Sequence, residues 1–142
     1  MDEKFIDSTK QRPQGERIMD APLVTIDLRS FTNQIRQEKA WTDNDRNTIT
    51  VFKTDGLRIV LIALHKNAEL ATHSVNGMIS VQVLEGQMIF TTEEQSVELN
   101  QGEMLALHKN IPHSVLAKEE TVFLLTLTTS LADKERPAVT EI

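Results

Sequence analysis

Four histidines, His65, His73, His108 and His113, are the residues of this sequence best suited to chemistry. Histidine is the commonest metal ligand and the usual general base near neutral pH. The chain has no cysteine, so disulfides and thiolate nucleophiles are excluded, and any metal must be held by histidine, carboxylate or amide groups. The sequence has no glycine-rich phosphate loop, nucleophile elbow or His-Glu-x-x-His motif, so nucleotide binding and common hydrolase chemistry lack support.

Short predicted strands surround these histidines. Segments Thr48–Lys53 and Leu57–Leu64 are β-branched and apolar, and Asp55-Gly56 between them is a strong signal for a two-residue hairpin. The same pattern recurs at intervals of about ten residues, which favours an all-β sandwich or barrel over a mixed fold. The further predicted strands are Ile79–Leu84, Met88–Thr91, Val97–Leu99, Met104–Leu107, Ser114–Ala117 and Val122–Thr128.

The chain outside the strands divides into an arm, a helix and a tail. Residues 1–22 are polar and lack periodicity, which predicts a flexible N-terminal arm, and residues 129–142 predict a frayed tail. Residues 23–128 form the predicted barrel domain. Apolar residues at helical intervals predict one short helix near residues 28–40, with Asp27 or Ser30 as its N-cap. We expect this helix to pack against the barrel or a dimer mate.

Composition excludes several classes of function. The 142 residues suit one domain, and 39% hydrophobic with 25% charged residues is typical of a globular protein. The net charge of −6 argues against nucleic acid as a partner. The charged N-terminus does not resemble a signal peptide, and the longest apolar stretch, Ile59 to Leu64, is far shorter than a membrane span. We therefore expect a cytoplasmic protein with no membrane partner.

Two segments of the sequence, from His73 to Gly86 and from Gly102 to His113, resemble the two consensus motifs of the cupin superfamily. The most specific parts are Val83-Leu84-Glu85-Gly86, a strand that runs into a glycine turn, and Ile111-Pro112-His113. The resemblance implies a small, single-domain, RmlC-like antiparallel jelly-roll β-barrel, a fold that is usually dimeric. It also implies a site on the inner strand faces, where metal-binding cupins place three histidines and one glutamate.

Only half of that ligand set is present in this chain. His73 and His113 match the first histidine of the first motif and the histidine of the second. The resemblance places the second histidine at Val75 and the glutamate at Ile79, so the first motif is degenerate. Period-two alternation turns the aliphatic residues of this segment toward the cavity. An apolar ligand pocket is therefore predicted, lined by His73, Val75, Ile79, Val81, Val83 and His113.

Three functions remain open. The first is a metal-independent barrel that binds a small molecule as a sensory or accessory protein. The second is a metal-dependent oxygenase or isomerase in which His73 and His113 hold iron, manganese, zinc or nickel with a third ligand recruited from His108 or Glu69. The third is a structural dimer whose barrel is filled by side chains, which predicts no ligand-sized cavity.

Two further expectations concern the backbone and the partner. Asn110 stands where the family usually has a glycine with positive φ, a conformation that asparagine tolerates better than most residues. An open jelly roll leaves edge strands with unpaired backbone groups, which favours coverage by another chain. We therefore expect a homodimer, with the N-terminal helix and arm as the cover.

Overall fold

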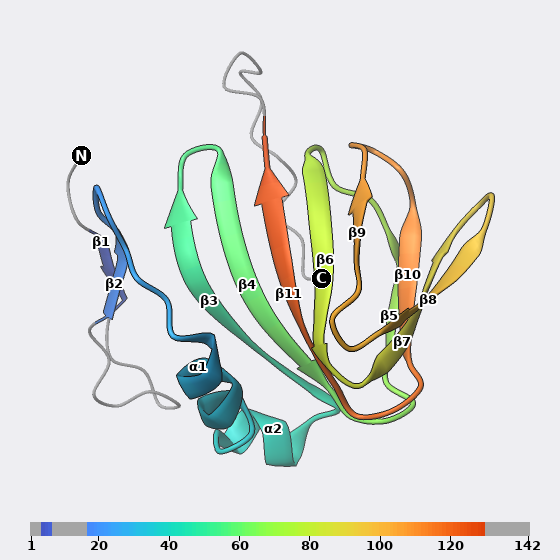
Figure 1. Cartoon of the computed structure of the whole chain (residues 1–142), viewed down its shortest axis with the longest axis horizontal. Coiled ribbons are helices and arrows are strands. Elements are labelled where there is room, and N and C mark those ends of the chain that lie inside the picture. The colour runs from blue at the N-terminus through green and yellow to red at the C-terminus, as the bar shows by residue number, and fades with distance from the viewer. Residues whose placement is uncertain (1–3, 7–16, 130–142) are drawn as a thin grey trace.

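The computed structural model describes residues 4–6 and 17–129 of the chain. Two antiparallel sheets face each other in it, and the chain crosses repeatedly from one to the other, as in a jelly roll (Figure 1). The five-stranded sheet has the order β3 (Arg46–Thr54), β4 (Leu57–Leu64), β11 (Thr121–Thr128), β6 (Met78–Glu85) and β9 (Met104–Leu107). The four-stranded sheet has the order β5 (Glu69–His73), β10 (His113–Ala117), β7 (Gln87–Thr92) and β8 (Ser96–Asn100).

All eight predicted strands are present, and the predicted all-β jelly roll is confirmed. Gly56 has a φ of 84° between β3 and β4, as the Asp55-Gly56 hairpin requires. Asn110 has a φ of 63°, which confirms the left-handed backbone expected at this position. The sequence pattern did not predict β5, because its residues Glu-Leu-Ala-Thr-His include few β-branched or aromatic side chains.

The N-terminal arm contains a strand pair that periodicity did not predict. β1 (Lys4–Ile6) pairs antiparallel with β2 (Arg17–Asp20), and a register shift interrupts the pairing. Strands of three and four residues are too short to show an alternating pattern in a polar sequence. Residues 7–16 of the predicted arm and residues 130–142 of the predicted tail lie outside the described residues.

The prediction of one continuous helix near residues 28–40 is wrong. The chain forms α1 (Leu28–Ile35) and a separate short α2 (Lys39–Asp43). The predicted N-cap is confirmed at Asp27, whose Oδ1 accepts a hydrogen bond from the Ser30 amide at 3.1 Å.

A buried polar contact explains the break between the helices. Glu38 has extended backbone angles, with φ −79° and ψ 149°, and its side chain is buried. Its carboxylate accepts hydrogen bonds from the side chains of Gln34 and Asn47, both at 2.9 Å. Because a buried carboxylate needs such donors, the tertiary contact with Asn47 on β3 overrides the local helical pattern.

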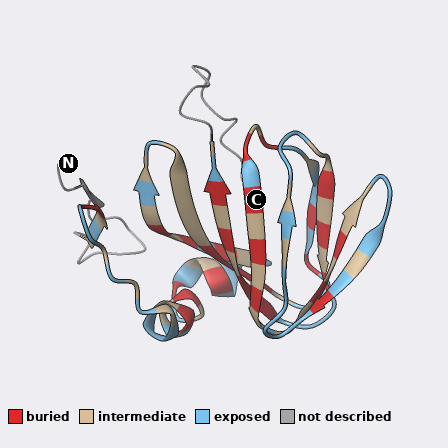
Figure 2. Cartoon of the chain, turned by 45° about the horizontal axis from the view of Figure 1, so that its top comes forward, coloured by how far each residue is buried: buried red, intermediate tan, exposed pale blue. Residues whose placement is uncertain are grey.

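Apolar side chains pack on both faces of the five-stranded sheet. Between the two sheets, residues such as Ile62, Val81 and Phe123 pack with Met88 and Phe90 of β7. Figure 2 shows the resulting alternation of buried and less buried residues along the central strands. On the outer face, the two helices supply Ile35 and Trp41, which cover buried residues of β3, β4 and β11, namely Ile49, Val51, Leu61, Ala63 and Val122.

Candidate functional site

His73 and His113 lie side by side on neighbouring strands. They are register partners in the pairing of β5 with β10, and their ring centroids are 4.5 Å apart with the planes tilted by 58°. His113 also stacks on Phe90 of β7, at 5.1 Å between centroids. The fold therefore brings together the two histidines that the sequence singled out from separate motifs.

Hydrogen bonds fix the protonated nitrogen of each ring in the same way. Nδ1 of His73 lies 2.9 Å from the Ala71 carbonyl oxygen, and Nδ1 of His113 lies 2.9 Å from that of Ile111. A carbonyl only accepts, so each Nδ1–H donates, and the Nε2 of a neutral ring becomes an acceptor. Both Nε2 atoms are buried and have no hydrogen-bond partner in the structure. The pair therefore offers two buried acceptor nitrogens.

Burial controls the charge of His113, which is only 1% exposed. Desolvation by burial is the largest effect and lowers the pKa of His113. The hydrogen bond to the Ile111 carbonyl raises this pKa, and the nearby His73 lowers it. The net shift of the pKa is downward. His113 therefore favours the neutral form, in which Nε2 can accept a hydrogen bond.

The predicted aliphatic wall packs in the interior. The side chains of Val75, Ile79, Val81 and Val83 are all buried, in one cluster with Phe90 and Val115 from the opposite sheet. The Val75 carbonyl accepts a hydrogen bond from the Asn110 amide at 2.8 Å, which ties the first motif to the loop before His113. Ile79, where the resemblance placed a glutamate, is thus a packed core residue.

A groove of about 510 Å³ opens on the inner face of the five-stranded sheet, on its β3 side. Its floor is apolar and consists of Val60, Ile62, Leu125 and Leu127. The rest of its lining is mainly polar and consists of Asn44, Asp45, Arg46, Asn47, Thr48, Thr50 and Arg58. We call this feature the β3–β4 groove.

The β3–β4 groove adjoins the aliphatic wall through shared cross-strand pairs. Leu127 of β11 is the register partner of both Arg58 on β4 and Ile79 on β6, and Leu125 likewise pairs with Val60 and Val81. Directly paired residues point to the same face of a sheet. The groove and the wall are therefore neighbouring parts of one surface.

The β3–β4 groove was not predicted from the sequence. The available signal was the placement of Thr48, Thr50 and Arg58 on the strand faces that carry apolar residues elsewhere in the barrel. A polar residue on an inward-facing position needs a partner or a ligand.

A second cavity, of about 410 Å³, lies between the β7–β8 turn and the loop before β10. Thr92, which contributes to its lining, is the register partner of His113, and Ile111 and Pro112 directly precede that histidine. The other lining residues are Glu93, Glu94, Gln95, Leu107 and Asn110. This cavity lies beside the end of β10 that carries His113.

Solved structures identify the architecture, although no protein-family model and no curated protein sequence matches this chain. A cupin superfamily protein from Desulfitobacterium hafniense aligns with a TM-score of 0.59 and 16% identity, over 61% of this chain and 80% of that one. An RmlC-like cupin from Desulfovibrio desulfuricans aligns with a TM-score of 0.56 and 25% identity, over 61% and 84%. The chain has the cupin fold.

Other structural matches differ in how much of each protein they cover. A conserved protein of unknown function from Streptococcus pyogenes aligns over 89% of this chain and 96% of its own, with a TM-score of 0.63 and 22% identity. A salicylate 1,2-dioxygenase from Pseudoaminobacter salicylatoxidans, in adducts with gentisate, has a TM-score of 0.62 and 19% identity over 70% of this chain. That match covers only 31% of the dioxygenase, so it supports the fold alone.

The donor set of this chain does not fit a catalytic metal held by three protein ligands. Among residues 4–6 and 17–129, no group of three or more His, Asp or Glu side chains could hold a metal ion. Glu69 and His108 are both exposed and do not join the histidine pair. Catalytic zinc and non-haem iron sites normally have three protein ligands.

The fourth histidine of the chain, His65, has a packing role. His65 stacks on Trp41 with ring centroids 3.4 Å apart, and its Nε2 lies 2.8 Å from the Trp41 carbonyl oxygen. The contact joins the start of the β4–β5 connection to α2. In the part of the chain that the structure describes, no helix has the length and apolar character to span a membrane.

Proposed function

We propose that this cupin binds a small organic ligand in the β3–β4 groove and does so without a catalytic metal. The observation that carries the proposal is the groove itself. Its volume of about 510 Å³ lies within the usual range of ligand pockets, and it combines an apolar floor with a few polar groups on one side. A structural dimer with a filled barrel predicts no such groove on the inner face, so the groove favours the ligand-binding function.

The chemistry of the groove supports binding rather than catalysis. Its side chains supply guanidinium, hydroxyl and amide groups, which recognise ligands but are weak nucleophiles and bases. Its carboxylate, Asp45, is hydrogen-bonded to Arg46 at 2.8 Å, and this bond lowers the pKa of Asp45. Neither His73 nor His113 contributes to the groove lining, so no general base is placed in it. These features suit a sensory or accessory protein.

The experiment is an NMR titration of chelator-treated protein with a set of small organic fragments. We expect fragments to shift the backbone amides of Thr48, Val60 and Leu125. Thr50→Phe should fill the groove and reduce these shifts, whereas Thr54→Phe, on the same strand but outside the groove lining, should leave them unchanged. If no fragment shifts amides of the groove, the proposal fails. The apolar pocket predicted beside His73 and His113 stays a prediction, and the same spectra would test it.

A second candidate function, a metal-dependent oxygenase or isomerase, is favoured by the two unpartnered Nε2 atoms. They are buried and belong to adjacent rings, as two ligands of one ion would be. The third ligand would have to be recruited by a rearrangement of His108 or Glu69. Metal analysis of protein purified without chelator separates the two functions. Close to one equivalent of iron, manganese, zinc or nickel that His73→Ala removes would favour the enzyme and contradict the metal-free proposal.

A further inference from the structure

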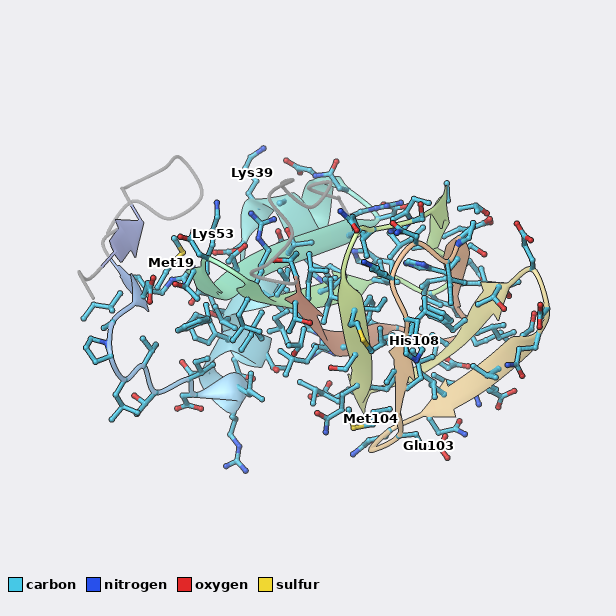
Figure 3. The ribbon with its side chains drawn as sticks, turned by 90° about the horizontal axis from the view of Figure 1, so that it is seen from above. Met19, Lys39, Lys53, Glu103, Met104 and His108 are labelled. Atoms are coloured by element: carbon cyan, nitrogen blue, oxygen red, sulfur yellow. The ribbon has the colours of Figure 1, made fainter. Side chains whose placement is uncertain are left out.

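Two cations lie opposite each other at the hairpin end of the β3–β4 groove. Lys53 of β3 and Arg58 of β4 are direct register partners, and Arg58 lines the groove. Side chains paired in this way point to the same face and have their Cβ atoms about 5 Å apart. Figure 3 shows Lys53 at the β3 edge of the five-stranded sheet, far from His108 at the β9 edge. Like charges in direct opposition destabilise a sheet unless an anion lies between them.

The neighbouring acidic and basic groups do not neutralise this pair. Arg46 donates to both carboxylate oxygens of Asp45, at 2.8 and 3.2 Å, and to the Glu69 carbonyl oxygen at 3.0 Å. The groove's carboxylate is therefore already paired with a guanidinium. Within residues 4–6 and 17–129, neither Arg58 nor Lys53 takes part in an ion pair.

The apolar floor of the β3–β4 groove extends away from this cationic end. Arg58, Val60 and Ile62 are successive inward-facing residues of β4, so the groove runs for about 13 Å along the strand from Arg58 to Ile62. Leu127 and Leu125 lie directly beside Arg58 and Val60 on β11. The groove thus has positive charge at one end and hydrocarbon along its length, with threonine hydroxyls on the β3 side.

We infer that the ligand of the β3–β4 groove is an amphipathic organic carboxylate. Its carboxylate pairs with Arg58, which can donate two parallel hydrogen bonds, and Lys53 adds a second positive charge. Its apolar body lies along the β4 and β11 floor. The inference rests on the proposed function, because it specifies the chemical class of the ligand in the same groove.

Three probes of equal chain length test the charge preference. Octanoate, 1-octanol and octylamine are each titrated into isotopically labelled full-length protein, and the amide shifts of Thr48, Val60 and Leu125 give the Kd. We expect octanoate to bind about tenfold more tightly than 1-octanol, and octylamine to bind most weakly. The preference for octanoate should decrease as the salt concentration rises.

A matched pair of variants tests whether the Arg58 guanidinium is the group that binds the carboxylate. Arg58→Gln should raise the Kd of octanoate about tenfold and leave that of 1-octanol unchanged, because only the carboxylate uses the guanidinium. Arg29→Gln makes the same change in net charge at an exposed position on α1, and it should leave both values unchanged. Backbone spectra of both variants confirm that the fold is retained.

The outcomes separate the ligand class from the proposed function. Equal affinity for octanoate and 1-octanol, with no effect of Arg58→Gln, would overturn the carboxylate inference while the groove remained a ligand site. Stronger binding of octylamine would overturn it in the same way. Failure of all three probes to shift the groove amides would contradict the inference, and failure of the neutral fragments in the earlier titration would then contradict the proposed function as well.

Discussion

The rings of His73 and His113 lie 4.5 Å apart across the β5–β10 pair, and each donates its Nδ1 proton to a carbonyl two residues before it. This arrangement turns both Nε2 atoms into buried acceptors. Protonation of His113 would place a positive charge in a low-dielectric interior, which is costly. His113 therefore favours its neutral form, and this has a measurable effect on folding.

We predict that acid destabilises the protein partly through His113. Burial holds the pKa of His113 below its ordinary value, which is about 6.5 in an unfolded chain. Between the folded and unfolded pKa values the unfolded state binds more protons, so the free energy of unfolding rises with pH. The stabilisation is complete above about pH 6.5 and is lost as the pH falls through the folded pKa. Urea unfolding at a series of pH values between 7.5 and 5 measures this pH dependence of the free energy of unfolding.

Matched glutamine variants separate this effect from general acid denaturation. His113→Gln should reduce the pH dependence of the urea midpoint, and His108→Gln, at an exposed position, should retain it. An unchanged pH dependence in His113→Gln would show that the buried histidine does not control acid stability.

Two glycines at positive φ should differ in their tolerance of alanine. Gly102 has a φ of 87° with no atom within 4 Å of an added Cβ, so Gly102→Ala should cost only the backbone penalty, about 1 kcal/mol. Gly86 has a φ of 96°, and its Cβ would clash with the Glu120 carbonyl oxygen and lie 2.7 Å from the Thr121 Cα. We expect Gly86→Ala to cost about 3 kcal/mol or more in total. Chemical denaturation measures the free energy of unfolding of both variants. Equal losses of stability would contradict the close contacts that the structure shows at Gly86.

The left-handed backbone at Asn110 gives a third prediction. Asn110→Ala should reduce the free energy of unfolding by about 1 kcal/mol, whereas Asn110→Gly should be nearly neutral. Lys109→Ala, at the adjacent exposed position, serves as the control and should have little effect. Denaturant melts of the three variants test this order, and a glycine variant less stable than the alanine variant would refute it.

We predict that the protein is a homodimer and that its N-terminal segment protects the outer face of the barrel. Ile35, which is fully buried, covers this face together with Trp41. Removal of residues 1–40 should therefore expose Ile49 and Leu61 and cause aggregation. Light scattering coupled to gel filtration measures the oligomeric state of the full and truncated chains. A truncated chain that stays soluble in an unchanged oligomeric state would count against the prediction.

Much of the fold follows from local patterns in the sequence. Alternating apolar residues and turn pairs such as Asp55-Gly56 placed eight strands correctly, and two short motifs singled out His73 and His113. Local sequence patterns gave a wrong prediction where a contact with a distant residue decides the structure. Asn47 on β3 holds the Glu38 carboxylate and ends the predicted helix early, and no periodicity within residues 28–40 contains that information.

By itself, the sequence determined the positions of eight strands, the jelly-roll class and the presence of valine and isoleucine at positions 75 and 79, because backbone preference and residue type are local properties. Only the tertiary structure decided that the two histidine rings touch, and that Arg58, which lines the β3–β4 groove with Leu127, lies opposite Lys53. Those relationships depend on the register between strands that are distant along the chain, and long-range packing of side chains sets that register.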